Sequence, residues 1–551
     1  MVLPTELRND VDVQEAKTMD RDTNSRLALV VTIASFLWVS AAGAQEKTTS
    51  TEKLGTVHFP VSCSAAAQPQ FDRAVALLHS FWYSEGVKAF TAVAATDPAC
   101  AMAYWGIAMS LWYPLWQPPD AATLKKGWVA VEQAKTLGAS TERERDYIAA
   151  IEAFYRDSDK LDHRTRGLAY EKAMERLYVR YPQDREAAVF YALALNATAL
   201  PTDKTYANQK KAGEILEKVF TEQPDHPGVA HYIIHSYDYS LLGNRALTAA
   251  RRYSQVAPSS PHAQHMPSHI FIRLGLWQET IRSDRAAAVA ARDANSVFEQ
   301  LHSLDYLMYA YLQGAQDREA KRVVDDRNAI GRMEQELIAA AYGFAAIPAR
   351  FAIETRRWAE AALLEPRPSR FTFTEAITHF ARALGAARGG DATSARKDVE
   401  RLETLRDGLT QAKQTYWAEQ VEIQRRAAAA WVARADGKTT EALALMRSAA
   451  DLEDSTEKHP VTPGPIVPAR ELLGELLLDL QQPAQALMEF EAALRSSPNR
   501  FNGLYGVARS AELSGDRDKA RGHYAKLVAL CEKADTERPE LQRAKAFLAR
   551  D

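Results

Sequence analysis

The chain has 551 residues, with 68 lysines and arginines against 71 aspartates and glutamates, so its formal net charge is −3. This length is too great for one compact core, so either several domains or a repeat array is expected. Charges of both signs alternate without a long basic block, which excludes a nucleic-acid backbone as the expected partner.

The first element is an apolar stretch over residues 27–42, which follows Arg26 and runs into small residues. This pattern predicts a secretory signal peptide over 1–44, cleaved after Ala44, and hence a periplasmic or secreted protein. The charged segment before it is unusually long, so translation is suspected to begin at Met19. An N-terminal membrane anchor is the alternative, because the uncharged run is nearly long enough to span a bilayer. No second such run follows, so no membrane span is expected in the mature chain.

The mature N-terminal segment, residues 45–70, contains the first of three cysteines. In an oxidising compartment Cys63 would pair with Cys100 and tie this segment to the first repeats. Two separate buried thiols are the other interpretation, because spacing alone cannot establish a disulfide.

Apolar residues recur at helical spacing from Phe71 almost to the end, and glycine and proline are sparse. Near the C-terminus the residues of a 34-residue tetratricopeptide (TPR) repeat recur in order, namely Leu473, Gly474, Leu477, Ala486, Phe490 and Pro498. The sequence therefore predicts an all-α, TPR-like, right-handed superhelical solenoid of about ten to twelve helix pairs. An N-terminal array is expected over 71–365 and a C-terminal array over 366–551. A ligand is expected in the concave groove formed by the first helices of the pairs.

Histidines concentrate in the middle of the chain at the repeat spacing. His231 and His265 are 34 residues apart, as are His235 and His269, and His302 follows His269 by 33. In the repeat alignment they lie beside the packing positions, so neighbouring helices should direct them into the groove. Neutral imidazole is the commonest metal ligand, and an i, i+4 pair can hold one ion from one helix. These five histidines therefore predict a transition-metal site, suited to Cu, Zn, Fe or Ni without a choice among them.

Acidic residues accompany the histidines at the same spacing. Asp238 and Asp305 take the twelfth place of their repeats, where they would either bind the ion or orient the imidazoles through their ring N–H groups. His262 lies at the turn before its helix and is left outside the ligand set.

Three residues elsewhere are weaker candidates for extra ligands or supporting groups. His79 is either such a residue or a packed histidine. The segment 457–465, EKHPVTPGP, cannot be helical. It is either an inter-repeat linker or an extended loop that enters the groove and places His459 near the site. Glu471, at the fifth place of the following repeat, would face the same groove.

Five segments resemble a group of bacterial exported TPR proteins with HYIIH and HMPSHIF motifs. They are CAMAYWGIAM (100–109), GVAHYIIHSYD (228–238), PHAQHMPSHIFIRLG (261–275), AIPARFAIETRRW (346–358) and EKHPVTPGPIVPARELLGELLL (457–478). The resemblance covers nearly the whole mature chain. It implies a fold and a compartment rather than a reaction.

Two hypotheses about function follow. In the first, the histidine cluster holds a metal with an open coordination position, and the protein is a metal-dependent enzyme that oxidises or hydrolyses a small organic substrate. In the second, it is a cell-envelope interaction scaffold that holds a peptide in the groove without catalysis. No Walker loop, dinucleotide-binding glycine motif, GxSxG or HExxH sequence occurs in the expected setting, so the corresponding common mechanisms lack support.

Overall fold

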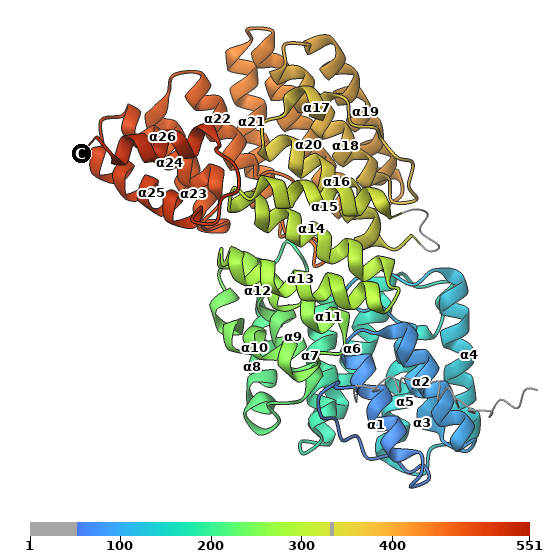
Figure 1. Cartoon of the computed structure of the whole chain (residues 1–551). Coiled ribbons are helices and arrows are strands. Elements are labelled where there is room, and N and C mark those ends of the chain that lie inside the picture. The colour runs from blue at the N-terminus through green and yellow to red at the C-terminus, as the bar shows by residue number, and fades with distance from the viewer. Residues whose placement is uncertain (1–51, 331–335, 551) are drawn as a thin grey trace, which may run out of the picture. The chain divides into compact units, whose positions relative to one another are not determined.

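The computed structural model describes residues 52–330 and 336–550, and every regular element in these ranges is a helix (Figure 1). Glu52–Asp551 forms one compact unit. The predicted signal peptide and its cleavage site lie outside the described residues. Among the helices of the described part, none is both long and apolar enough to cross a bilayer.

The helices of the first part of the chain are α1 (Gln68–His79), α2 (Tyr83–Thr96), α3 (Ala101–Ser110), α4 (Ala121–Leu137), α5 (Glu142–Tyr155), α6 (His163–Arg180), α7 (Arg185–Thr198), α8 (Ala207–Glu222), α9 (Pro227–Tyr237), α10 (Gly243–Val256), α11 (Pro261–His265), α12 (Pro267–Arg273) and α13 (Trp277–Asp293). Those of the second part are α14 (Val297–Gln313), α15 (Asp317–Ala329), α16 (Ile338–Glu354), α17 (Trp358–Ala362), α18 (Thr372–Arg388), α19 (Ala392–Gln411), α20 (Thr415–Ala435), α21 (Thr439–Asp454), α22 (Ala469–Asp479), α23 (Pro483–Ser496), α24 (Phe501–Leu513), α25 (Arg517–Leu530) and α26 (Pro539–Leu548).

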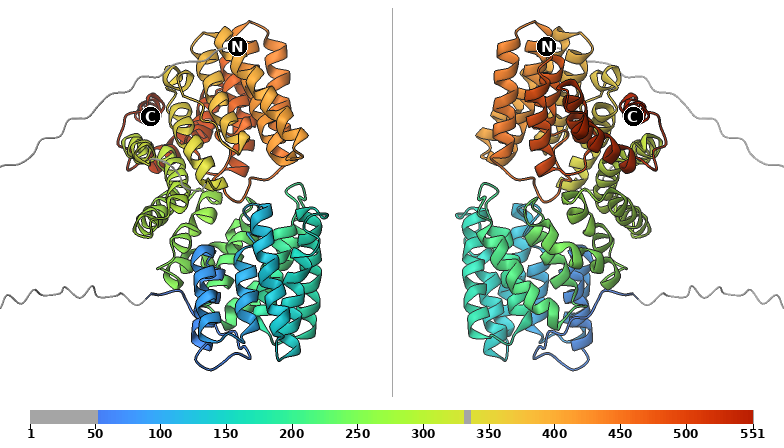
Figure 2. Two further views of the ribbon diagram at one scale, coloured as in Figure 1. Left: turned by 90° about the vertical axis from the view of Figure 1, so that its right-hand side faces the viewer. Right: turned by 90° about the vertical axis from the view of Figure 1, so that its left-hand side faces the viewer.

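The helices pack in chain order, so neighbours in sequence are neighbours in space (Figures 1 and 2). In the described ranges they form twelve pairs, from α1 with α2 to α24 with α25, followed by α26; α11 and α12 together serve as one first helix. First helices of successive pairs also contact one another, as α14, α16, α18 and α20 do. This arrangement confirms the predicted all-α, TPR-like solenoid.

The pair α22 and α23 shows why the repeat residues are needed. A Cβ atom on Gly474 would lie only 2.7 Å from the ring of Phe490, so a larger side chain could not occupy that position. Phe490 is itself buried, together with Leu477 and Ala486. The repeat positions identified in the sequence are therefore the inter-helix contacts of this pair.

A non-helical N-terminal segment packs against the early helices. The backbone N–H of Thr56 donates to the carbonyl of Asp225 at 2.9 Å, and Phe59 is fully buried. Cys63 and Cys100 form a disulfide with Cα atoms 4.9 Å apart. The segment is thus joined covalently to the start of α3.

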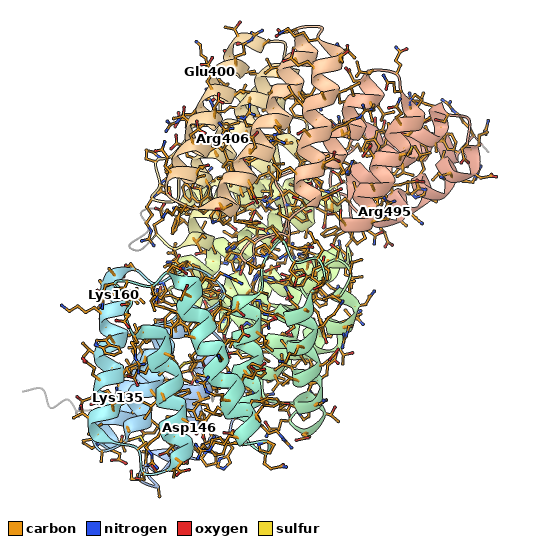
Figure 3. All side chains as sticks on the ribbon, turned by 180° about the vertical axis from the view of Figure 1, so that it is seen from behind. Lys135, Asp146, Lys160, Glu400, Arg406 and Arg495 are labelled. Atoms are coloured by element: carbon orange, nitrogen blue, oxygen red, sulfur yellow. A yellow bond between two sulfur atoms is a disulfide. The ribbon has the colours of Figure 1, made fainter. Side chains whose placement is uncertain are left out.

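Charged residues cover the outer helix surfaces, as the alternation of charge in the sequence suggests. Lys135, Lys160 and Glu400 are exposed on three separate parts of the chain (Figure 3). The helices thus expose a polar face to solvent, and their apolar faces pack between the pairs.

Candidate metal centre

Three successive first helices bring six buried histidines together. They come from α9, from α11 with α12, and from α14, and they are His231, His235, His262, His265, His269 and His302. We call them the histidine cluster. The ring centroids of His265 and His302 are 4.2 Å apart, those of His231 and His262 are 5.0 Å apart, and those of His235 and His269 are 5.8 Å apart. The five histidines predicted from the sequence lie together, and His262, predicted to lie in the turn before its helix, lies among them.

The position of His262 follows from where α11 begins. Ser260 caps this helix by accepting a hydrogen bond from the N–H of Ala263, and Pro261 occupies the first turn. His262 is therefore inside the helix rather than in the turn before it. A capping serine followed by proline is a helix-start signal, and it would have placed His262 on this helix from the sequence alone.

A proline interrupts the histidine-bearing first helix of the second pair. Pro267 has no N–H to continue the helical hydrogen bonds, and the helix divides there into α11 and α12. His265 and His269 lie on opposite sides of this break, yet their Nε2 atoms are only 3.0 Å apart.

The cluster divides into two triads of potential ligand atoms. In each triad, one nitrogen from every histidine lies within 4.8 Å of the other two. The first triad contains His231, His235 and His262, and the second contains His265, His269 and His302.

In the first triad, an Nδ1 contact orients one imidazole. His231 Nδ1 donates to the backbone carbonyl of His79 at 2.6 Å, which leaves its Nε2 as a lone pair facing Nε2 of His235 at 3.1 Å. Neither ring nitrogen of His262 has a hydrogen-bond partner among the described residues, although this residue is 1% exposed. Oε2 of Glu299 lies 3.5 Å from His262 Nδ1 and also lacks a hydrogen bond there. Buried polar atoms without partners are costly, so this group needs a further partner.

In the second triad, carboxylates hold two imidazoles. His265 Nδ1 lies 2.6 Å from Oδ1 of Asp284, and His269 Nδ1 lies 2.9 Å from Oδ2 of Asp238. When both Nδ1 atoms donate to these carboxylates, the two Nε2 lone pairs face each other at 3.0 Å. Two nitrogens bound at the usual length to one tetrahedral ion are about 3.3 Å apart. Carboxylate groups behind histidines are the usual support of metal-binding imidazoles.

The two supporting carboxylates have opposite electrostatic surroundings. Burial raises the pKa of Asp238, but Lys458 and Arg273 outweigh this effect and hold that pKa well below its usual range. Burial raises the pKa of Asp284 well above its usual range, and Asp305 raises it further while the Ser268 hydroxyl lowers it. Among the described residues, no cation offsets the burial of Asp284, so a positive ion bound by His265 would supply the missing charge.

Burial keeps the imidazoles in their neutral, ligating form. It lowers the pKa of His269 to about 4 and the pKa of four further histidines well below 6.5, namely His231, His235, His265 and His302. The neighbouring histidines lower these pKa values further. At pH 7 these five side chains are therefore available to bind a cation.

These shifts predict how the stability of chelator-treated protein depends on pH. The folded pKa of His269 is lower than that of the unfolded chain, so the unfolded state takes up protons first as the pH falls. The contribution of neutral His269 should be complete above about pH 6.5 and should fall by about 3 kcal/mol towards pH 4. Urea unfolding at several pH values measures this. The variant His269→Gln should show a shallower dependence, and an equal slope in both proteins would contradict the assignment.

The acidic residues predicted beside the histidines have different roles. Asp238 hydrogen-bonds to Nδ1 of His269 and so orients this imidazole, which is the second of the two roles expected for it. Asp305 instead accepts a hydrogen bond from Arg350 Nε at 3.0 Å, and no hydrogen bond joins it to a histidine among the described residues. Its Oδ1 atom therefore belongs to a buried ion pair, while its Oδ2 atom is buried without a hydrogen-bond partner among the described residues, so its role at the cluster stays a prediction.

The weaker candidates do not complete the cluster with their side chains. His79 contributes its backbone carbonyl to His231, while its ring hydrogen-bonds to Glu186 at 2.9 Å. The ring of His459 lies 4.9 Å from Trp417, and Glu471 accepts a hydrogen bond from Arg500 at 2.7 Å.

A third group of possible ligands is already satisfied by protein contacts. His79, His226 and Glu186 lie close enough to hold an ion. Both histidines hydrogen-bond to the carboxylate of Glu186, and the remaining ring nitrogens contact the Tyr232 hydroxyl and the N–H of Val229. This group is therefore a structural link between α1, α7 and α9.

The proline-rich loop after α21, residues 455–468, packs against the first helices beside the cluster. Lys458 forms an ion pair with Asp238, and the Tyr306 hydroxyl donates to the carbonyl of Thr462 at 3.0 Å. The same hydroxyl is 3.3 Å from Nε2 of His269. This loop is therefore more than a linker, but it brings Lys458 to the site rather than His459.

Asp284 was not found from the sequence, although a signal for it exists. His265 on the first helix of its pair contacts Asp284, 19 residues later on the second helix. His379 and Asp398 have the same separation and the same contact, at 2.6 Å. A histidine followed after 19 residues by an aspartate thus marks a hydrogen bond between two paired helices of this chain.

A cavity of about 560 Å³ adjoins the residues that support the cluster. Its lining includes Lys458 and Thr462 of the loop, together with Arg273, which also binds Asp238. Aromatic side chains such as Tyr342 and Trp417 form part of its wall. The cavity can therefore accept an organic molecule beside Lys458 and Arg273, which contact Asp238, the carboxylate that holds His269.

Comparison with known proteins finds no matching family model and no matching curated protein. Among solved structures, human IFIT1, solved as a dimer with m7Gppp-AAAA, is 12% identical, with 78% of this chain and 90% of that chain covered and a TM-score of 0.33. Cut9 in the APC/C Cut9-Hcn1 hetero-tetramer is 11% identical, with coverages of 88% and 90% and a TM-score of 0.32. Yeast Tom70 is 13% identical, with coverages of 88% and 95% and a TM-score of 0.28. At such low scores, the evidence for the fold is the helix pairing of this chain itself.

Proposed function

We propose that this chain is an exported TPR-type metal protein whose histidine cluster holds two transition-metal ions, one in each triad. The observation that carries the proposal is the set of buried imidazole nitrogens that face one another or lack a hydrogen-bond partner. A metal ion accepts lone pairs from several such nitrogens at once, whereas a hydrogen bond can satisfy only one acceptor per proton.

The division into two triads supports two ions rather than one. Each triad supplies three imidazoles from two first helices, and the first triad has Glu299 beside His262 as a further oxygen ligand. Such ligand sets suit Cu, Zn or Fe. A bound ion would also be expected to displace the proton that burial favours on Asp284.

The proposal extends to catalysis on a small organic substrate. In the second triad, three protein ligands leave a coordination position for water or substrate, which distinguishes a catalytic site from a closed structural one. A zinc-type ion would activate water for hydrolysis, and copper or iron would favour oxidation. The neighbouring aromatic cavity is the place where we expect the substrate to bind.

Export is supported by the resemblance to exported TPR proteins and by the disulfide. A disulfide between Cys63 and Cys100 persists in an oxidising compartment. The scaffold hypothesis is less favoured, because the chain's own loop lies where a peptide would bind the first helices. Arg350 on α16 donates to the carbonyls of Gly464 and Pro465, at 2.9 and 2.5 Å.

Metal analysis of protein purified without a histidine tag tests the proposal. We expect about two ions per wild-type chain and a marked loss in the double variant His235→Ala, His269→Ala, which removes one ligand from each triad. The matched control is His379→Ala, His523→Ala, because these partly buried histidines lie outside the cluster. Less than one ion per chain in the wild type after incubation with each metal would overturn the proposal.

A further inference from the structure

Two arginines outside the histidine cluster share one aromatic ring. The guanidinium carbon of Arg327 on α15 lies 3.4 Å from the ring centroid of Phe344 on α16. That of Arg367, in the loop between α17 and α18, lies 4.5 Å from the same centroid. Across the described ranges, neither arginine forms an ion pair with a carboxylate.

A cavity of about 240 Å³ opens beside this pair. It lies between α15, α16, α18 and the loop that carries Arg367. Ala341 and Ala345 on α16 are one helical turn apart, and their small side chains leave space towards α18. On that helix Thr374 and Thr378 also line the cavity. The site thus combines an apolar floor with hydroxyl groups, two cations and two carboxylates at its edge.

The two guanidinium groups place like charges close together. Burial lowers the pKa of Arg327 to about 10, and the charge of Arg367 contributes to the same shift. Glu336 and Glu365 also line the cavity, but Glu336 accepts a hydrogen bond from the backbone N–H of Arg370, and Glu365 is exposed. An anion between the arginines would relieve this repulsion.

The available donors indicate which anion fits. Arg327 uses Nε on the carbonyl of Phe344 and Nη1 on Oδ1 of Asn328, so its Nη2 group remains for a ligand. Arg367 donates to no described residue. Together they offer more N–H groups than the two oxygens of a carboxylate can accept, and two positive charges match a dianion.

We propose that this cavity binds a tetrahedral oxyanion, phosphate or sulfate, either free or carried by a small ester. Arg327 and Arg367 hold its oxygens from two sides, and the hydroxyl of Thr378 provides a neutral contact. The site does not depend on a metal in the histidine cluster.

Isothermal titration calorimetry of the full chain with inorganic phosphate, sulfate and glycerol phosphate, at low salt, tests the proposal. We expect saturable binding of at least one of these probes, weakened at least about tenfold in Arg367→Gln, because one charged fork is lost. Arg367 is exposed, so this variant should fold normally. The matched control is Arg370→Gln. It removes the same charge at a position three residues after Arg367, where the side chain stacks on Phe371 and not on Phe344.

The probes and variants separate the possible outcomes. Stronger binding of glycerol phosphate would identify an ester as the ligand, and equal binding would identify the free anion. Binding that persists in His235→Ala, His269→Ala would place the anion outside the metal centre. No saturable binding of any probe, or equal weakening in Arg367→Gln and Arg370→Gln, would overturn the proposal.

Discussion

Replacing His262 by alanine is expected to remove one bound ion and leave the other. The substitution reduces the first triad to two imidazoles, while the second triad keeps all three. Loss of a direct ligand should lower the affinity for the affected ion at least about a hundredfold, because loss of a supporting contact already lowers metal affinity about 10- to 100-fold. Metal content after dialysis against a weak chelator measures the result.

The control for this prediction removes a histidine that contacts a carboxylate elsewhere. His379 hydrogen-bonds to Asp398 at 2.6 Å and belongs to neither triad, so His379→Ala should keep both ions. Unchanged metal in His262→Ala would show that the first triad holds no ion. Loss of both ions would show a single shared site in place of two.

Replacing Arg350 by methionine is expected to lower the free energy of unfolding by about 3–5 kcal/mol. Arg350 is fully buried, and its loss leaves the carboxylate of Asp305 buried without a charge partner. The carbonyls of Gly464, Pro465 and Ile466 would also lose a donor, which frees the loop beside the cluster. Urea unfolding followed by circular dichroism measures the change.

Two comparisons establish the cause of this loss. Arg357→Met removes a half-exposed arginine that pairs with Glu360, and it should change the free energy of unfolding by less than about 1 kcal/mol. The double variant Arg350→Met, Asp305→Asn should recover part of the stability, because no uncompensated charge remains buried. A loss as small as that of Arg357→Met would contradict the role given to the ion pair.

The repeat fold was predictable because its signals are local. The spacing of Gly474, Ala486 and Phe490 reflects contacts within one helix pair, so a short sequence window contains the information. The spacing of His235 and His269 follows the same rule, because equivalent places in successive repeats lie side by side. Composition and periodicity therefore located both the fold and the centre of the candidate site.

The partners of the histidines were harder to predict because they come from distant parts of the chain. Lys458 is 220 residues from Asp238, and the carbonyl that orients His231 belongs to His79, 152 residues earlier. No repeat spacing relates these positions. Asp305 has the same register as Asp238, but its charge partner is Arg350, 45 residues later.

The sequence by itself determined an all-helical repeat array and the helix faces that carry five of the clustered histidines, because helix periodicity and repeat length act over neighbouring residues. Only the tertiary structure decided that six imidazoles divide into two triads, that Asp284 and Asp238 support the second, and that the loop 455–468 lies beside it. Those features depend on side-chain orientation and on contacts between remote segments, which burial and charge pairing select only when the whole chain has folded.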